Sequence, residues 1–250
     1  MPYRAAMTDS NDLLYGVHPV VEALKNPKRR FVSLLASKNA ADRFATEIAA
    51  AKVAVEIIHP RELDRRLGSD AVHQGLLLEA KPLPQLRLDQ IEKSGVVVLL
   101  DQVTDPHNVG AILRTCAAFR ATALVATARH SPEGSGVLFK AASGAFEHVP
   151  YVKVTNLSRA MEELKSYGFR IVGLDSEAGG LVRDVDRTAP LAIVMGAEGK
   201  GLRQLTRANC DQLVRLDLGG PIQSLNVSNA AAIALYALTS EQLAAQAGRS

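Results

Sequence analysis

The residues of this chain that are best suited to chemistry lie in three clusters in its carboxyl-terminal part. They occupy residues 101–115, 195–202 and 219–228, and each directly follows an apolar run. The clusters combine amide, guanidinium, carboxylate and hydroxyl groups with glycines, which let backbone approach a ligand closely. Open α/β sheets bind ligands beyond the carboxyl ends of their strands, because loops and helix N-termini meet there. The pattern therefore predicts one polar ligand site assembled from three strand ends.

Five side chains in these clusters are candidates for the site: Asn108, Arg114, Glu198, Ser224 and Asn226. Asn108 could instead cap a helix, and Arg114, with apolar neighbours on the same helix, could be a surface or interface arginine. Ser224 could cap the last helix, with Asn226 in its first turn. Glu198 lies between glycines and has little packing reason to be there, which favours a functional role. For the other four residues both interpretations stay open at this point.

Several common catalytic motifs are excluded. Gly201 follows Lys200 where a phosphate-binding P-loop requires Ser or Thr. Phe139 stands where a dinucleotide-binding fingerprint beginning at Gly134 requires its third glycine. The sequence contains no G-x-S-x-G nucleophile elbow. The sequence therefore lacks the motifs by which kinases, dehydrogenases and hydrolases are usually identified.

The composition is that of an ordinary globular protein with a mild basic excess. The 250 residues are 47% hydrophobic and 22% charged, with a net charge of +3, which permits a nucleic-acid partner without demonstrating one. Cys116 and Cys210 lack neighbours at metal-ligand or disulfide-framework spacing, so we expect buried thiols and no metal site. Residues 1–11 are polar, and no run approaches the roughly 18 apolar residues of a membrane span. We expect a cytoplasmic protein without membrane contact.

Alternating strand and helix patterns predict two α/β units, at residues 12–81 and 94–250. Pro82 and Pro84 break the pattern between them and predict a linker at 82–93. In the first unit we expect helices at 16–24, 40–51 and 60–67 and strands at 31–36, 53–59 and 75–80. In the second, we expect strands at 96–101, 122–127, 149–154, 171–175, 192–196 and 213–218, and helices at 108–119, 157–167, 201–210 and 224–246. Strands that are apolar throughout indicate a mostly parallel sheet covered on both faces.

The three clusters together resemble the signature motifs of the SpoU (TrmH) family of RNA ribose 2′-O-methyltransferases. The matching stretches are N-x-G-A-x-x-R-T at 108–115, G-A-E-G-x-G at 196–201 and S-L-N-V-S at 224–228. Tyr15-Gly-Val-His-Pro-Val-Val-Glu-Ala-Leu and Val72-His-Gln-Gly resemble the substrate-binding domain of the branch that methylates a guanosine in large-subunit ribosomal RNA. The resemblance covers nearly the whole chain from residue 13 onward.

The resemblance implies a cofactor, a fold and an assembly. It implies S-adenosylmethionine as methyl donor, a small amino-terminal α/β RNA-binding domain and a carboxyl-terminal SPOUT-type domain with a trefoil knot. It also implies a homodimer, for which an alanine stripe at 231, 234 and 237 could supply close contact, although the stripe could equally pack on its own sheet. The cofactor-binding residues that it implies are Gly196, Gly199, Leu216, Leu218, Ile222 and Leu225. Relatives commonly have Pro-Met where this chain has Asp217-Leu218, a departure that leaves the main-chain contacts available.

The resemblance also assigns the central task to Arg114. Because arginine is effectively always protonated, we expect it to clamp an RNA phosphate and polarise the ribose hydroxyl rather than to accept a proton. Asn226 and Ser224 would then hydrogen-bond the ribose region, and Glu198 would hold Arg114 or Asn108 in place.

Basic residues are the expected RNA contacts. They are Lys28, Arg29 and Arg30, which form the densest cationic cluster, and Arg129, which follows an expected strand. Charge clusters are often only solvated. Two alternatives stay open for the function: transfer RNA or another ribosomal position as the substrate, or a non-catalytic RNA-binding assembly factor.

Overall fold

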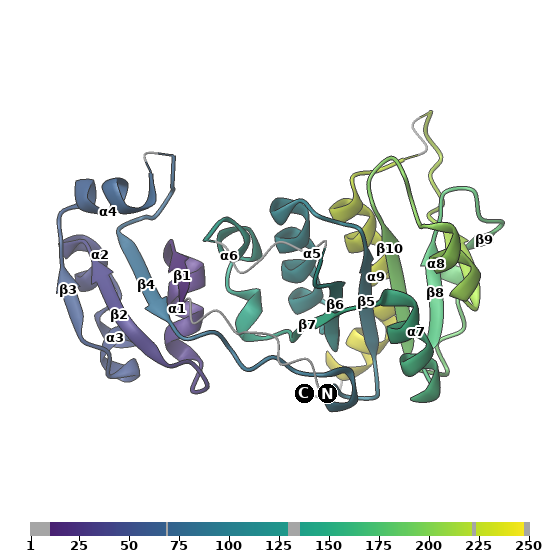
Figure 1. The fold of residues 1–250 in the computed structure, drawn as a ribbon, viewed down its shortest axis with the longest axis horizontal. Coiled ribbons are helices and arrows are strands. Elements are labelled where there is room, and N and C mark those ends of the chain that lie inside the picture. Colours follow the sequence, from purple (N-terminus) through teal and green to yellow (C-terminus); the bar gives the residue numbers. More distant parts are fainter. Residues whose placement is uncertain (1–10, 69, 130–135, 222–223, 248–250) are drawn as a thin grey trace, which may run out of the picture. The chain divides into compact units, whose positions relative to one another are not determined.

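The structure, a computed structural model, describes residues 11–68, 70–129, 136–221 and 224–247 (Figure 1). The described residues form two compact units. The first is drawn from residues 1–84 and 134–140, and the second from 85–133 and 141–250. No helix among the described residues is both long and apolar enough to cross a membrane.

The first unit is a four-stranded mixed sheet with helices, in the strand order β1-β4-β2-β3. β4 pairs antiparallel with β1 and β2, and β2 pairs parallel with β3. Its elements are β1 (Asp12–Tyr15), α1 (Val17–Lys25), β2 (Phe31–Ala36), α2 (Lys38–Arg43), α3 (Ala45–Ala51), β3 (Val55–Ile57), α4 (Pro60–Leu67) and β4 (Leu76–Ala80). Leucines fill the core: Leu14, Leu34, Leu63, Leu76 and Leu78 are at most 1% exposed.

Three features of this unit differ from the sequence prediction. The helix expected at 40–51 is divided at Phe44, which leaves the helical backbone region (φ −111°, ψ 24°) while its ring is buried. The strand expected at 53–59 is reduced to β3, because only residues 55–57 pair with β2. β1 was not predicted, since its four residues are too few to show a clear alternation.

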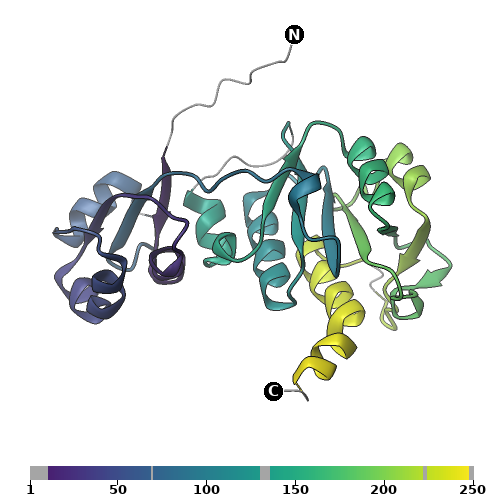
Figure 2. The ribbon, with the colours of Figure 1, turned by 90° about the horizontal axis from the view of Figure 1, so that it is seen from below.

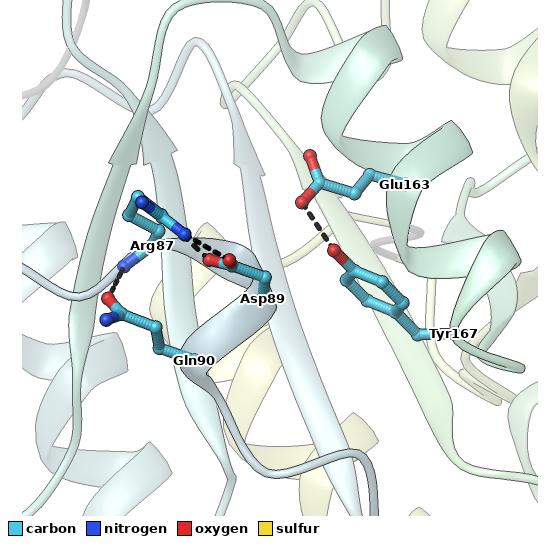
Figure 3. A network of polar contacts seen from close by, with 5 residues as sticks. All are labelled: Arg87, Asp89, Gln90, Glu163 and Tyr167. Atoms are coloured by element: carbon cyan, nitrogen blue, oxygen red, sulfur yellow. Dashed lines mark hydrogen bonds and ion pairs between the residues drawn. The ribbon is translucent and has the colours of Figure 1, made fainter.

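The segment that follows the two prolines packs on the second unit instead of running free. Leu88 and Ile91 are each 5% exposed and belong to the apolar core of that unit. A short 3₁₀ turn, η1 (Leu88–Gln90), carries them. Arg87 closes the turn, because its backbone N–H donates to Oε1 of Gln90 at 2.9 Å and its guanidinium pairs with Asp89 (Figure 3). The linker expected at 82–93 thus contains core residues.

A neighbouring contact ties the same segment to α7 (Leu157–Ser166). The Nζ atom of Lys93 lies 4.2 Å from the ring centroid of Tyr167, the residue that follows this helix. The Tyr167 hydroxyl donates to Oε1 of Glu163 at 2.8 Å (Figure 3), and this hydrogen bond raises the pKa of the hydroxyl. Two kinds of contact therefore hold this segment on the second unit: the burial of Leu88 and Ile91 and the contact of Lys93 with the Tyr167 ring.

The second unit is a seven-stranded sheet in the order β7-β6-β5-β10-β8-β11-β9, and all its strand pairs are parallel. Its strands are β5 (Val96–Asp101), β6 (Ala123–Thr127), β7 (Tyr151–Val154), β8 (Arg170–Leu174), β9 (Gly180–Leu181), β10 (Leu191–Gly196) and β11 (Gln212–Arg215). Its other helices and turns are α5 (Pro106–Ala118), η2 (Ala145–Glu147), η3 (Val182–Asp184), α8 (Gln204–Asn209) and α9 (Val227–Ala247). The helix α6 (Gly136–Ala142) is divided between the units, since its residues up to 140 belong to the first unit and its last two to the second. The expected strand-and-helix alternation is present, with the short elements β9, α6, η2 and η3 in addition.

Helices cover both faces of this sheet (Figures 1 and 2). Leu157, Met161 and Leu164 of α7 pack on one face, against core residues that include Leu99 and Val125. α5 and α9 pack against each other and lie on the opposite face. This two-sided cover is why the central strands contain almost no polar residue. Both cysteines are free thiols, and burial raises the pKa of Cys210 to about 11.

Gly110 is the point of closest approach between α5 and the residues that end α6. A Cβ atom at this position would lie 2.5 Å from the Cβ of Ala141 and 2.8 Å from the backbone nitrogen of Ala142. In an exposed helix, Gly→Ala stabilises by about 1 kcal/mol. Here the contact is with backbone and a buried helix, which cannot move aside cheaply.

We therefore predict that Gly110→Ala lowers the free energy of unfolding by about 1–3 kcal/mol, the cost of overpacking. Urea denaturation followed by circular dichroism measures the change. A gain of about 1 kcal/mol, as helix propensity alone would give, would contradict the close approach.

Candidate active site

The first two polar clusters meet because β5 and β10 are neighbours in the sheet. Their parallel register sets Asp101, the last residue of β5, beside Gly196, the last residue of β10. Asp101 is fully buried. Its carboxylate accepts hydrogen bonds from the backbone N–H of Arg203 at 3.0 Å and from the guanidinium Nε at 2.7 Å. One buried charge therefore fixes the far end of the loop that follows β10.

The loop between these anchors is closed so tightly that only glycine fits at its start. A Cβ atom on Gly196 would lie 2.2 Å from the carbonyl carbon of Gly201 and 2.4 Å from its oxygen. The backbone N–H of Gly201 donates to the carbonyl of Ala197 at 2.9 Å, and Gly201 itself has φ 63°. This closure holds Glu198 at the turn of the loop.

Asn226 connects the three clusters. Its amide nitrogen Nδ2 donates to Oδ1 of Asn108 at 3.0 Å and to Oε2 of Glu198 at 3.3 Å, across 118 and 28 positions of sequence. Its Oδ1 accepts from the backbone N–H of Ser228 at 2.9 Å and from the Ser228 hydroxyl at 2.6 Å. Asn226 therefore caps α9, a role that the sequence interpretation had offered to Ser224, and joins the other two clusters with the same side chain.

The structure corrects the interpretation of Asn108 as a helix cap. α5 begins earlier, at Pro106, and Asp105 caps it by accepting from the backbone N–H of His107 at 3.1 Å. Asn108 therefore lies inside the first turn, where its side chain is available to Asn226. The physical reason is the Asp-Pro pair, since proline suits the first helical position and Asp the position before it.

The expected role of Glu198 also changes. In the described part of the chain its carboxylate contacts Asn226 rather than Arg114 or Asn108. Arg114 is exposed on α5, and no described residue pairs with it. Six residues along a helix correspond to about 9 Å and about 120° of rotation, so Arg114 points away from the side of α5 that carries Asn108.

A cavity of about 190 Å³ opens beside this cluster. It is bounded by the ends of β8, β10 and β11 and by the start of α9. Five of the expected cofactor residues line it, namely Gly196, Gly199, Leu216, Leu218 and Leu225, together with Glu198 and Ser224. The sixth, Ile222, lies outside the described residues. Asn226 and Asn108 are joined to the cavity wall through Glu198.

The lining suits the adenosine part of a cofactor. Leucine side chains can sandwich a flat base, while glycines leave main-chain groups accessible for hydrogen bonds. Asp217, which stands where relatives commonly have proline, is not part of this lining. Its carboxylate pairs with Nη1 of Arg183 at 2.7 Å, so the departure from the family pattern brings no charge into the cavity.

Some residues of the site were missed by the sequence analysis. Asp101 was read only as the end of a strand, and neither Arg203 nor Arg215, which lines the cavity, was singled out. Asp175 lines the cavity as well and pairs with Arg207 at 2.5 Å. An acidic residue directly after an apolar strand was the available signal for Asp101 and Asp175.

The expected RNA contacts divide into two groups. Lys28 and Arg30 in the first unit are exposed, and so is Arg129 in the second. Arg29 is different: its side chain is 1% exposed, Nη1 lies 2.6 Å from Oδ2 of Asp12 and it donates to the carbonyl of Lys81 at 3.1 Å. Arg29 is thus a buried structural residue, and its expected contact with RNA is withdrawn.

The two amino-terminal motifs are neighbours in the first unit. The backbone N–H of Val17 donates to Oε1 of Gln74 at 3.1 Å, and that of Gly16 donates to the carbonyl of Leu76 at 3.2 Å. Gln74 has φ 54° and Gly75 has φ 81°, so the chain turns sharply there. The two motifs that carry the amino-terminal resemblance therefore meet at the start of α1.

The buried pair of Asp101 and Arg203 yields a stability prediction. Asp101→Asn removes the charge and replaces one of the two acceptor oxygens with an NH2 group, which can only donate, so one of the two hydrogen bonds from Arg203 is lost. Because Arg203 is 46% exposed, we expect a loss of about 1–3 kcal/mol in the free energy of unfolding. Urea denaturation measures this loss.

Asp184→Asn is the matched control, since Asp184 is 68% exposed and 3.9 Å from Arg183, and this substitution should change the free energy of unfolding by less than about 0.5 kcal/mol. Equal effects of the two substitutions would contradict the anchoring role of Asp101.

Comparison with known proteins places the chain in a family. Residues 95–236 match the SpoU rRNA methylase family, and residues 13–86 match the RNA 2′-O ribose methyltransferase substrate-binding family. A protein of Vibrio vulnificus, named 23S rRNA (guanosine-2′-O-)-methyltransferase RlmB, is 38% identical over 95% of this chain and 100% of its own length. The protein of the same name from Pseudomonas putida is 40% identical over 89% of this chain and 94% of its own.

Solved structures agree. The SpoU methyltransferase AviRb from Streptomyces viridochromogenes, in complex with the cofactor AdoMet, superposes with a TM-score of 0.79 at 26% identity, covering 94% of this chain and 91% of that one. A crystal structure titled RNA 2′-O ribose methyltransferase gives a TM-score of 0.81 at 22% identity, covering 94% and 90%. The expected fold class is confirmed. The chain belongs to the SpoU rRNA methylase family.

Proposed function

We propose that this chain transfers the methyl group of S-adenosylmethionine to the ribose 2′-hydroxyl of a guanosine in 23S ribosomal RNA. Relatives with that named activity are 38% and 40% identical to it over nearly their whole lengths. The observation that carries the proposal is the contact of Asn226 with both Asn108 and Glu198 beside the leucine-lined cavity. It joins the three family motifs into one site.

The cavity residues fit the cofactor by their chemistry. Leu216, Leu218 and Leu225 offer apolar surface to the adenine, and the glycines at 196 and 199 leave main-chain groups free to hydrogen-bond it. The volume of about 190 Å³ is below the roughly 300 Å³ of a complete small-ligand site, so this cavity encloses a part of the cofactor. S-adenosylmethionine, when bound, supplies an electrophilic methyl group.

The residues of the chain position the acceptor. Arg114 is exposed and unpaired among the described residues, so its guanidinium is available to an RNA phosphate and to the hydroxyl beside it. Ser224, exposed at the edge of the cavity, is the hydrogen-bonding group for the ribose region. Glu198 and Asn108 hold the Asn226 amide in one orientation. Alignment of this kind can supply a large part of a rate acceleration, up to about 7–11 kcal/mol.

RNA binding divides between the units in this proposal. The amino-terminal domain, residues 12–81, binds RNA, and residues 94–250, after the linker at 82–93, carry out methyl transfer. Lys28 and Arg30 contact RNA phosphates from the first domain and Arg129 from the second. A ribose 2′-hydroxyl is the group that distinguishes RNA from DNA, so the substrate must be RNA. Ribosomal RNA as substrate makes the cytoplasm the place of action.

A homodimer is also part of the proposal. Ala231 and Ala234 are at most 1% exposed within one chain, so these two alanines of the stripe pack against the chain's own core, while Ala237 is half-buried. The exposed side of α9 instead presents Ile233, 44% exposed, and Tyr236, 61% exposed. Large apolar side chains on one exposed helix face are typical of an interface with a second copy.

Labelled S-adenosylmethionine and separately purified RNAs test the substrate. We expect label in 23S ribosomal RNA, recovered as 2′-O-methylguanosine at one position when the RNA is digested and analysed by mass spectrometry. Label in transfer RNA, or at a base instead of a ribose, would contradict the proposed substrate. A chain that binds RNA but neither binds the cofactor nor transfers label would instead be the non-catalytic assembly factor.

Arg114→Ala tests the division of labour. We expect methyl transfer to fall at least about 100-fold, a typical effect of removing one polarising group, because the acceptor is no longer oriented. The dissociation constant for S-adenosylmethionine, measured by calorimetry, should stay within about threefold. Arg159→Ala on α7 is the matched control, since Arg159 is exposed and lies outside the cavity, and it should retain full activity. Loss of cofactor binding by the Arg114 variant would contradict its assignment to the acceptor.

A further inference from the structure

Arg215 lines the cavity with a guanidinium that the described residues do not fully hydrogen-bond. It is the last residue of β11, where it pairs in register with Leu181 of β9, and it lines the cavity. Its Nη1 atom is buried and has no hydrogen-bond partner in the part of the chain that the structure describes. A guanidinium stays protonated at every accessible pH, so this donor cannot be neutralised by losing its proton.

Three other arginines in this region each form an ion pair with a carboxylate. Arg203 pairs with Asp101 at 2.7 Å, Arg207 with Asp175 at 2.5 Å and Arg183 with Asp217 at 2.7 Å. Each of these carboxylates is therefore already engaged by another arginine. Buried polar groups in proteins are nearly always hydrogen-bonded, so an unpartnered donor on a residue that lines the cavity points to a partner that arrives from outside the chain.

We propose that Arg215 binds the amino-acid carboxylate of S-adenosylmethionine. The proposal rests on the proposed function, which supplies the ligand. The cofactor carries two positive groups, the sulfonium and the ammonium, and a single anionic group, its carboxylate. Arg215 is the one base among the described ionisable residues of the cavity wall, whereas Asp175 is paired with Arg207 and Glu198 accepts a hydrogen bond from Asn226. Guanidinium and carboxylate form short, often bidentate hydrogen bonds, which makes this pairing the strongest that Arg215 can enter.

This contact would determine which ligands the cavity selects. Its remaining wall consists mostly of apolar side chains and main-chain groups, which recognise an adenosine but not the charge at the other end of the cofactor. A hydrogen bond to a charged group contributes more than a neutral one, and its loss corresponds to roughly tenfold or more in affinity. Arg215 therefore makes the site selective for ligands that carry a carboxylate.

Calorimetry with two ligands tests the proposal. The probes are S-adenosylmethionine and decarboxylated S-adenosylmethionine, which differ only in the carboxylate. We expect the unchanged protein to bind the first at least about tenfold more tightly. In Arg215→Gln this preference should fall below about threefold, mainly because S-adenosylmethionine binds more weakly, and Arg215→Lys should restore part of it. Arg170→Gln is the matched control: Arg170 is 36% exposed, pairs with Asp186 at the opposite end of β8, and should leave the preference unchanged.

Each other outcome overturns the proposal. Equal binding of the two ligands by the unchanged protein does so without any variant, which keeps the test decisive even if Arg215→Gln fails to fold. A fall in affinity by the same factor for both ligands would make Arg215 a structural residue of the wall. An unaltered preference combined with weaker RNA binding would assign it to an RNA phosphate. Failure of the unchanged protein to bind either ligand would contradict the proposed function itself, and the role of Arg215 with it.

Discussion

The parallel pairing of β5 with β10 is the constraint on which the site depends. It sets Asp101 beside Gly196, and the buried carboxylate of Asp101 then holds Arg203 at the end of the following loop. A charge without contact to water has to be fully paired, so the loop has little freedom to open. The position of Glu198, and with it the cavity wall, follows from this anchor.

Asn226 extends the same arrangement to the last helix. Its oxygen caps α9 while its nitrogen reaches Asn108 and Glu198, so one amide satisfies a helix end and joins three segments. A capping role and a role in the proposed site are therefore compatible, because the contact that caps α9 also orients the amide nitrogen toward Asn108 and Glu198.

Local patterns predicted local structure well and long-range partners poorly. β5 and α4 have the predicted bounds, since one is a continuous apolar run and the other begins with proline. The sequence left open whether Asn108 caps a helix; it does not, because the helix starts at the Asp-Pro pair that begins three residues earlier. Arg29 appeared to be part of a basic surface cluster, but Asp12, in a strand too short to predict, buries it. The unpaired Arg215 could not be foreseen, because sequence spacing does not reveal which carboxylates are already engaged.

The central claim is that residues from three strand ends act as one site. A double-mutant cycle of Asn108→Ala and Asn226→Ala tests it most directly, with kcat/KM for methyl transfer as the measured quantity. Residues that act as a unit are strongly non-additive. The kcat/KM of the double variant should therefore be about as low as that of the less active single variant. Independent effects, with the two losses multiplying in the double variant, would contradict a single site built around Asn226.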